Sequence, residues 1–326
     1  MNHKSLPVLM LTAICLWCAA PSALAWDATG HMQIADIAWT KLSPHAKLAV
    51  IAILEAGDPG FRPVSSSDAD RRAAFRKAAT YCDVIKGDRT TQYESIIPEM
   101  NLTFFKKHPP DPNNNEDNTC KTWHYYDTAI RDMGSHPAED SNALNALTLA
   151  REKLASLDKG GSPDRKMQCW WLYWIEHVTG DLHQPLHCVS SYEFFPDKGD
   201  AGGNLLMITD PARPDRPSRL HGYWDGGITH AIALDRAAGL PVTPEDITKR
   251  WCEDKALKPS GKDAADLKVA DWIKAGAVEA DKIVYDDLKQ NSTLTAEYVA
   301  AQIPFCKKQA VLAGTRLAEV INAALK

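Results

Sequence analysis

The residues best suited to chemistry lie in one stretch, between Trp170 and His187. On a helix, His177 and Asp181 leave the same face one turn apart, because they are four residues apart. Pro185 is poorly accommodated inside a helix, so the helix should end before it and His187 should point in another direction. Imidazole and carboxylate groups that converge in this way are candidate metal ligands. Taken alone, His177 could instead be a buried histidine with satisfied hydrogen bonds.

A second histidine and aspartate pair repeats this spacing farther along the chain. His221 and Asp225 are again four residues apart and again lie beside a tryptophan, while Asp83 and His124 each follow an apolar residue. A buried carboxylate needs a partner or a metal, because unpaired burial is costly. The candidates are too many for one zinc ion, and their nitrogen and oxygen donors fit catalytic zinc. They are Asp83, His124, His177, Asp181, His187, His221 and Asp225.

The N-terminal segment has the features of a secretory signal peptide. A positively charged start precedes an apolar run at residues 6–19, too short for a stable membrane span, and a cleavage site of A-x-A type at residues 23–25. We therefore expect residues 1–25 to be removed and the mature protein to be secreted or periplasmic. Cleavage would free the α-amino group of Trp26, whose nitrogen and carbonyl oxygen could chelate a metal. His31 would follow one helical turn later.

Helices must position these groups, because apolar residues recur at helical spacing along most of the mature chain. A hydrophobic content of 44% without a long linker predicts one domain, residues 26–326. Only residues 199–218, rich in glycine and proline, indicate a small β-hairpin. The fold should therefore be mainly α with one minor β element. After a first helix that ends near Lys41, helices are expected at 44–55, 68–85, 142–157, 164–181, 264–288 and 295–324.

The charge of the chain limits how it could bind an anionic partner. The formal charge of −5 argues against nucleic-acid binding through general electrostatics. If the substrate is a polyanion, the attraction must be local, and bound divalent cations are the obvious source. The alternative is that nothing anionic binds. No run after residue 25 is long and apolar enough for a membrane helix, so no anchor is expected once the signal peptide is removed.

Six cysteines remain after loss of the signal peptide. In an exported protein this number suggests up to three disulfides, although the sequence does not select the pairing. The cysteines are Cys82, Cys120, Cys169, Cys188, Cys252 and Cys306.

The other histidines and the central tryptophans have simpler expected roles. His183 lies two positions after Asp181 and should face away from the ligands, as a supporting or surface residue. Surface positions are expected for His45, His108, His136 and His230. Core positions are expected for Trp170, Trp171 and Trp174.

Several separate motifs follow one another along the mature chain. They are Trp26-x4-His31, Asp83, Trp123-His124-Tyr125, His177-x3-Asp181-x5-His187 with Gln184-Pro185-Leu186, Gly202-Gly203-Asn204, and His221-x3-Asp225. Together they resemble the zinc-dependent type I nucleases, which include the single-strand-specific nucleases of moulds and the bifunctional nucleases of plants. That family is related in fold to the zinc phospholipases C. The resemblance covers essentially the entire mature chain and implies a single-domain, largely α-helical fold with a short β element.

The resemblance implies a cluster of three zinc ions. Asp181 would bridge two of the ions, and Asp181 and Lys86 would be the catalytic residues. Water shared between two zinc ions loses a proton readily, and its attack on phosphorus would release 5′-phosphorylated products without a covalent enzyme intermediate. The implied ligands are Asp83, His124, His177 and Asp181 for one zinc, His187, His221 and Asp225 for a second, and Trp26, His31 and Asp181 for the third.

The resemblance also implies how the substrate is held. Lys86 matches a basic position that contacts phosphate, although alone it would be read as a solvated helix lysine. Tyr125 and Asp127 match positions of a base pocket, and Asn204 matches the amide that helps line it. Fungal members have Phe where this chain has Tyr125, which keeps a ring for stacking. Because stacking needs an unpaired strand, the expected substrates are RNA, single-stranded DNA and nucleotides, with 3′-nucleotidase activity.

Two other functions are compatible with the same residues. A phospholipase C could use this cluster on a lipid head group, although the base-pocket residues favour a nuclease. A secreted zinc-binding protein without turnover is the third hypothesis. Three or four protein ligands per metal leave coordination positions open, which argues against it because structural zinc sites are closed. A monomer is the default expectation.

Overall fold

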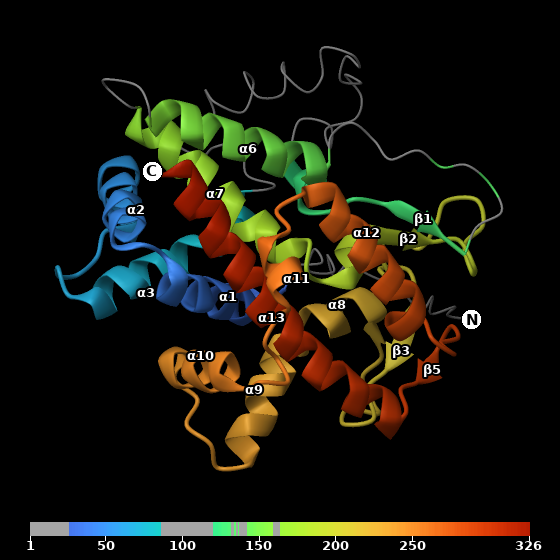
Figure 1. Cartoon of the computed structure of the whole chain (residues 1–326). Coiled ribbons are helices and arrows are strands. Elements are labelled where there is room, and N and C mark those ends of the chain that lie inside the picture. Colours follow the sequence, from blue (N-terminus) through green and yellow to red (C-terminus); the bar gives the residue numbers. More distant parts are fainter. Residues whose placement is uncertain (1–25, 86–119, 132–133, 135, 137–141, 159–163) are drawn as a thin grey trace, which may run out of the picture.

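Helices form where apolar residues recur at helical spacing, and a computed structural model confirms the predicted mainly α fold (Figure 1). The described residues are 26–85, 120–131, 134, 136, 142–158 and 164–326. The predicted signal peptide, residues 1–25, lies outside them.

The N-terminal helices begin where short polar side chains accept hydrogen bonds from first-turn N–H groups. The capping residues are Asp27, Ser43 and Ser67. They begin α1 (Ala28–Lys41), α2 (Pro44–Gly57) and α3 (Asp68–Ala78), and a 3₁₀ turn, η1 (Pro59–Phe61), lies between α2 and α3.

The helix predicted at 68–85 is interrupted, which corrects that expectation. It divides into α3 and α4 (Tyr81–Ile85). At the break, the Ala79 carbonyl accepts a hydrogen bond at 2.7 Å from Nδ1 of His177, if that nitrogen carries the proton. The Ala79 carbonyl therefore faces a side chain of another helix. In a continuous helix, this carbonyl would instead have pointed along the helix axis.

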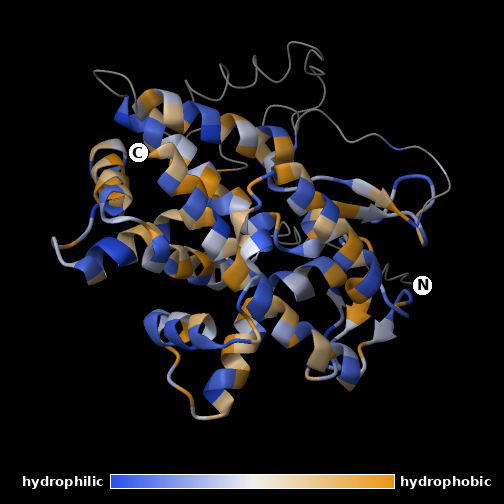
Figure 2. Cartoon of the chain, in the orientation of Figure 1, coloured by the Kyte–Doolittle hydropathy of each residue, from blue (hydrophilic) through white to orange (hydrophobic). Residues whose placement is uncertain are grey.

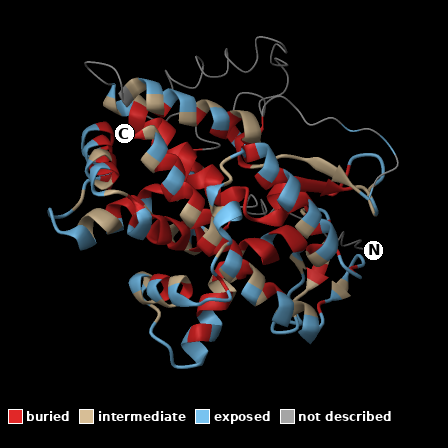
Figure 3. Ribbon diagram, viewed as in Figure 1, coloured by how far each residue is buried: buried red, intermediate tan, exposed pale blue. Residues whose placement is uncertain are grey.

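A helix that is buried over most of its length forms the axis of the fold. The predicted helices at 142–157 and 164–181 are confirmed as α6 (Ala143–Asp158) and α7 (Arg165–Asp181). Every residue of α7 from Gln168 onward is buried, and α7 packs against α1, α2, α6 and α13. Figure 3 shows that buried residues gather in the interior of the molecule. A helix surrounded in this way can carry polar side chains inward only if they find partners there.

The C-terminal half continues with shorter helices and ends in a long one. The helix predicted at 264–288 is divided, because Asp266 turns the chain by accepting hydrogen bonds from the Lys268 N–H and, through its carbonyl, from the Trp272 indole. The elements are α8 (Leu220–Asp225), α9 (Gly227–Ala237), α10 (Pro244–Glu253), α11 (Gly261–Ala265), α12 (Val269–Glu279), the π-helical turn η4 (Ala280–Val284) and α13 (Ala296–Ala324). Figure 2 shows hydrophilic residues alternating with apolar ones along α10, as expected of an outer helix.

Two small sheets complete the described fold and lie at one edge of the molecule in Figure 1. The predicted hairpin is confirmed by the antiparallel pairing of β3 (Met207–Thr209) with β4 (Ser218–Arg219). β5 (Ser292–Thr293) pairs with β3 in parallel, and β1 (Thr128–Ile130) pairs in parallel with β2 (Val189–Ser191). The 3₁₀ turn η2 (Cys120–His124) precedes β1, and η3 (Pro185–Cys188) leads directly into β2.

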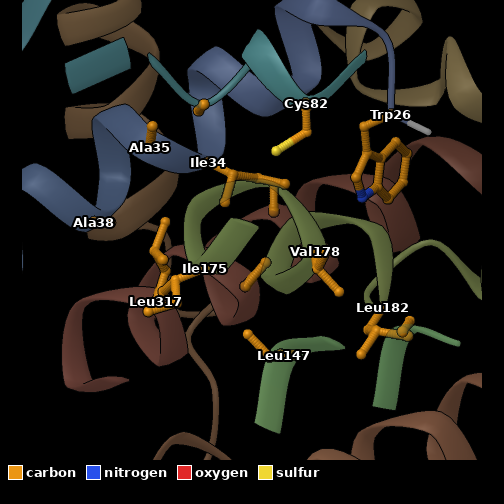
Figure 4. Packing of buried hydrophobic residues seen from close by; sticks show 14 of the residues in the cluster. Trp26, Ile34, Ala35, Ala38, Cys82, Leu147, Ile175, Val178, Leu182 and Leu317 are labelled. Atoms are coloured by element: carbon orange, nitrogen blue, oxygen red, sulfur yellow. The ribbon is translucent and has the colours of Figure 1, made fainter. Parts of the chain in front are cut away.

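The core is continuous from the first helix to the last. Figure 4 shows Ile34, Ile175, Val178 and Leu317 packed together where α1, α7 and α13 meet. The three tryptophans of α7 are fully buried, which confirms their predicted core role. Over the described residues, every helix is either too short or insufficiently apolar to span a bilayer.

No disulfide joins the six cysteines of the described chain, so the expected disulfide framework is not observed. Several of these residues instead fill space beside a glycine at a close crossing of elements. A Cβ atom added to Gly276 would lie 2.6 Å from the Cys188 sulfur, and one added to Gly227 would lie 2.5 Å from the Cys306 sulfur. These thiols therefore act as small apolar packing groups.

Candidate metal centre

Histidine and aspartate side chains meet in three groups inside the protein. Within each group, one ligand atom per residue lies within 4.8 Å of the others, and almost all of the residues are buried. The groups are His31, His177 and Asp181; Asp83, His124 and His177; and His187, His221 and Asp225. The structure thus brings together every histidine and aspartate that the sequence nominated as a ligand.

The last turns of α7 supply the centre of the first two groups. His177 belongs to both groups, and its Nε2 lies 3.6 Å from Oδ1 of Asp83 and 3.6 Å from Oδ1 of Asp181. Oδ1 of Asp181 also lies 3.2 Å from Nε2 of His31, whereas its Oδ2 lies 3.1 Å from Nδ1 of His124. The two oxygens of Asp181 therefore face different histidines. Asp181 therefore contacts histidines of both groups, and its contact with His124 is a hydrogen bond.

The third group forms just beyond the end of α7. As predicted, α7 ends before Pro185, and Pro185 begins the separate turn η3, which contains His187. Nε2 of His187 lies 3.6 Å from Oδ1 of Asp225, and Nε2 of His221 lies 3.5 Å from Oδ2 of the same residue. Asp225 and His221 stand one turn apart on α8, which is the spacing that the sequence suggested.

Backbone carbonyls fix the orientation of three candidate ligands. The Nδ1 atoms of His177, His187 and His221 lie 2.7, 2.8 and 2.6 Å from the carbonyl oxygens of Ala79, His124 and Gly202. In a neutral imidazole, donation from Nδ1 leaves Nε2 unprotonated and able to bind a metal, which is how second-layer partners orient ligating histidines. These carbonyls were not predicted, because backbone groups leave no mark in the sequence.

Two glycines allow this close packing. Gly202 has φ of +61°, and a Cβ there would lie 2.4 Å from the Leu186 carbonyl oxygen, so only glycine fits the turn that presents its carbonyl to His221. At Gly180 a Cβ would lie 2.9 Å from Nδ1 of His31. The Gly202-Gly203-Asn204 motif thus has a structural reason that its sequence alone did not disclose.

His183 resembles the candidate ligands in the hydrogen bond of its Nδ1 but differs from them in the partner of its Nε2. Its Nδ1 also lies 2.7 Å from a carbonyl, that of Thr179, but its Nε2 accepts a hydrogen bond at 2.9 Å from the guanidinium of Arg316. Burial, reinforced by the Arg316 charge, lowers the pKa of His183 to about 3. The residue is buried and supports α13, so the prediction that it faces away from the ligands is consistent with its position.

The electrostatics of the first two groups favour a cation. Although burial alone would lower it, the carboxylates of Asp181 and Asp83 raise the pKa of His177 to about 9. Burial likewise disfavours the charged form of Asp181, yet the imidazoles of His177 and His124 hold its pKa well below the usual range. Burial and the neighbouring His177, stacked 3.8 Å away, lower the pKa of His31. The proton on His177 thus supplies positive charge at a place where a metal ion could supply it instead.

Several buried atoms of the groups have no hydrogen-bond partner among the described residues. They include Nε2 of His31, His177 and His221, Oδ1 of Asp181 and Oδ2 of Asp225. Buried polar atoms of this kind normally have partners. Because all of them are nitrogen or oxygen donors that converge, the groups could hold metal ions of the kind that imidazole and carboxylate bind.

The new N-terminus predicted from the sequence lies beside these groups. The indole of Trp26 donates to the carbonyl of Gly180 at 3.0 Å, and the Asp27 N–H donates to the carbonyl of Asp225 at 3.0 Å. The backbone of Trp26 is therefore held between the end of α7 and the end of α8. His31 follows in the first turns of α1 and reaches Asp181.

The predicted substrate residues are only partly placed. Tyr125 directly follows His124, Asp127 lies two residues farther along, and both are half-buried. Asn204 donates through Nδ2 to the Ala201 carbonyl at 2.9 Å, and its buried Oδ1 accepts no hydrogen bond within the described chain. Lys86 lies outside the described residues.

The remaining histidines mostly follow expectation. His45 and His136 are exposed, as predicted, whereas His230 is half-buried beside Tyr223, which corrects its predicted surface position. The residue that sequence reasoning overlooked is Gln184, whose side chain contacts Asp225. Its place in the Gln184-Pro185-Leu186 motif was the available signal.

Replacing His183 with Leu should leave the bound metal unchanged. The cost should fall on stability, about 1–3 kcal/mol, because the buried guanidinium of Arg316 loses its acceptor. Metal per chain by elemental mass spectrometry and the free energy of unfolding in urea measure the two effects. His187→Leu is the matched comparison and should release metal. Loss of metal from the His183 variant to the same degree would contradict its assignment as a supporting residue.

Comparisons with known proteins assign the chain to a family. The sequence model of the family described as S1/P1 Nuclease matches residues 26–326. Endonuclease 2 of Arabidopsis thaliana is 25% identical over 337 residues, covering 98% of this chain and 98% of that protein. Nuclease S1 of Aspergillus oryzae is 26% identical over 259 residues, covering 73% of this chain and 82% of that protein. The chain therefore belongs to the S1/P1 nuclease family and is an enzyme that hydrolyses phosphodiester bonds.

Proposed function

We propose that this protein is an exported zinc nuclease that cleaves RNA and single-stranded DNA to 5′-phosphorylated products and removes phosphate from 3′-nucleotides. The observation that carries the proposal is the meeting of three buried histidine and aspartate groups around the end of α7. Their nitrogen and oxygen donors fit catalytic zinc, and the family relationship fits the reaction.

Three zinc ions are assigned to these groups. Asp181 is the shared ligand, since its Oδ1 faces His31 and His177 and its Oδ2 faces His124. The proposed ligands are Asp83, His124, His177 and Asp181 for one ion, His187, His221 and Asp225 for the second, and Asp181, His31 and the α-amino nitrogen and carbonyl oxygen of Trp26 for the third. The hydrogen bonds that hold Trp26 and Asp27 in place support the last assignment.

Zinc supplies Lewis acidity when bound, because it lowers the pKa of coordinated water and offsets the negative charge of phosphate. The protein fixes where this happens. Backbone carbonyls hold the imidazoles of His177, His187 and His221 so that Nε2 points inward. The buried indoles of α7 exclude bulk water on the side of His124, whose ring lies 5.3 Å from that of Trp174. Rigid, dry walls of this kind strengthen electrostatic stabilisation of a charged transition state.

The substrate is oriented by residues at the edge of the groups. Tyr125 would stack on a base and Asp127 would hydrogen-bond to it. Oδ1 of Asn204, which accepts no hydrogen bond from the described residues, would be a further acceptor for a base amino group. Lys86 would bind phosphate. This arrangement favours nucleic acid over a lipid head group, because a base has ring faces and amino groups and a choline does not.

Export completes the proposed site. Removal of residues 1–25 as a signal peptide would leave residues 26–326 as one secreted or periplasmic nuclease domain, and the family match begins at Trp26. The mature protein is proposed to act as a monomer.

Mature protein that starts at Trp26 and is loaded with zinc should convert a single-stranded oligonucleotide to products with 5′-phosphates. Mass spectrometry of the products measures both cleavage and the position of the phosphate. A duplex of the same sequence is the control and should be cleaved more slowly, because its bases are not available for stacking. An intact oligonucleotide together with hydrolysis of phosphatidylcholine would favour a phospholipase, and zinc binding without either activity would favour a non-catalytic protein.

Asp181→Asn should weaken two zinc sites together, because one carboxylate serves both. We expect the loss of two zinc ions per chain and a fall in kcat/KM of more than about 100-fold, since changes in outer-layer partners alone typically cost 10–100-fold. Elemental analysis and steady-state kinetics measure these effects. Asp235→Asn removes a carboxylate that pairs with Arg250 and Lys307 and should keep all zinc. Loss of a single zinc from the Asp181 variant would rule out bridging.

A mature chain that retains one extra residue before Trp26 should lose one zinc and most of its activity. The extra peptide bond removes the basic α-amino nitrogen and leaves an amide that binds zinc poorly. Zinc per chain and the rate of oligonucleotide cleavage are the measurements, and a chain extended after Lys326 is the control. Full zinc and full activity in the extended chain would refute the role of the N-terminus.

A further inference from the structure

Gln184 is a fully buried amide in the link between α7 and η3. Its backbone connects two candidate ligands: its N–H donates to the Asp181 carbonyl at 2.9 Å, and its carbonyl accepts from the His187 N–H at 2.9 Å. Its side chain reaches a third, because Nε2 donates to Oδ1 of Asp225 at 2.7 Å. One residue therefore contacts members of two metal-binding groups that different parts of the chain supply.

The side-chain amide has a single usable orientation. Oε1 of Gln184 accepts a hydrogen bond from the Leu186 N–H at 2.6 Å, so the amide nitrogen must be the atom that faces Asp225. The two hydrogen-bond partners thus determine which end of the amide carries the nitrogen. A donor held in this way can interact only with an acceptor, and the carboxylate of Asp225 supplies it.

The hydrogen bond from Gln184 determines which carboxylate oxygen of Asp225 is available to a cation. Oδ1 is engaged by Gln184, whereas Oδ2 lies 3.5 Å from Nε2 of His221 and has no hydrogen-bond partner among the described residues. The backbone of Asp225 is fixed independently, because its carbonyl accepts from the Asp27 N–H. The remaining freedom of this residue is rotation of its side chain, and the Gln184 amide removes it.

We propose that Gln184 is a positioning residue that locks the Asp225 carboxylate with Oδ2 toward the cation of the His187, His221 and Asp225 group. This inference rests on the proposed zinc function. It differs from a purely structural role, in which a buried glutamine satisfies its own hydrogen bonds and contributes only to stability. The two roles differ in what happens to bound zinc.

Gln184→Glu tests the proposal with little change in shape. The variant keeps the acceptor for the Leu186 N–H but replaces the donor to Asp225 with a second carboxylate. We expect the purified full-length mature protein to hold one zinc fewer per chain than the wild type, or to bind that zinc on the order of 10–100-fold more weakly, as for other outer-layer partners of metal ligands. Elemental mass spectrometry and competition with a chromophoric chelator measure the count and the affinity.

Gln309→Glu is the matched control. The Gln309 amide also donates to a carboxylate, that of the half-buried Glu279, at 3.0 and 2.9 Å, but it lies on α13 outside the three metal groups. This variant should lose thermal stability and keep the zinc content of the wild type. A Gln184 variant that behaves in the same way, destabilised with full zinc, would overturn the proposal.

A second variant and a wild-type measurement keep the test independent of folding. Gln184→Met retains the chain length without added charge, and its zinc affinity should fall as well; wild-type affinity would count against the proposal. Anomalous diffraction at the zinc edge from wild-type crystals should place zinc on Oδ2 of Asp225 with Gln184 on Oδ1. Zinc bound through Oδ1, with the amide turned away, would overturn it. A wild type that binds no zinc would instead refute the proposed function.

Discussion

Charge buried in the middle of the protein is the constraint on which the rest of the structure depends. α7 is enclosed by other helices, yet its last turns carry an imidazole and a carboxylate into the core. Asp181 is fully buried, and its nearest charged or chargeable neighbours are histidines. Such an arrangement is stable only if positive charge is present, either as protons or as cations. The raised pKa of His177 shows that the surroundings already attract that charge.

Backbone carbonyl groups, as well as side chains, form the candidate metal centre. Carbonyl groups at the end of α3, at the end of η2 and in the glycine turn before β3 each face the Nδ1 atom of a histidine. The same atoms explain local irregularities in the fold, since the break between α3 and α4 lies where a carbonyl turns toward His177. Departures from regular structure are thus placed where ligands need orientation. This is the usual relation between an outer layer of partners and a metal site.

The sequence was sufficient for the helices and for the membership of the groups. The spacing of His177 and Asp181, and of His221 and Asp225, follows directly from helical periodicity, and Pro185 correctly predicted where the chain leaves α7. The sequence was insufficient where the structure depends on contacts between distant parts of the chain. The β1 and β2 strands have only three residues each and no alternation to reveal them. The six cysteines suggested disulfides because composition reports the compartment, whereas their packing beside glycines depends on how helices cross.

The distribution of the groups along the chain couples folding to metal binding. Their members come from α1, α4, η2, α7, η3 and α8, so no local segment contains a complete group. An unfolded chain cannot present these donors together, and a ligand that binds only the native state stabilises it by mass action. Without cations, the folded protein must keep unpaired nitrogen and oxygen atoms buried, which opposes folding. If the groups bind metal as proposed, stability and the ability to bind a phosphodiester depend on the same few atoms, and a substitution among them should alter both.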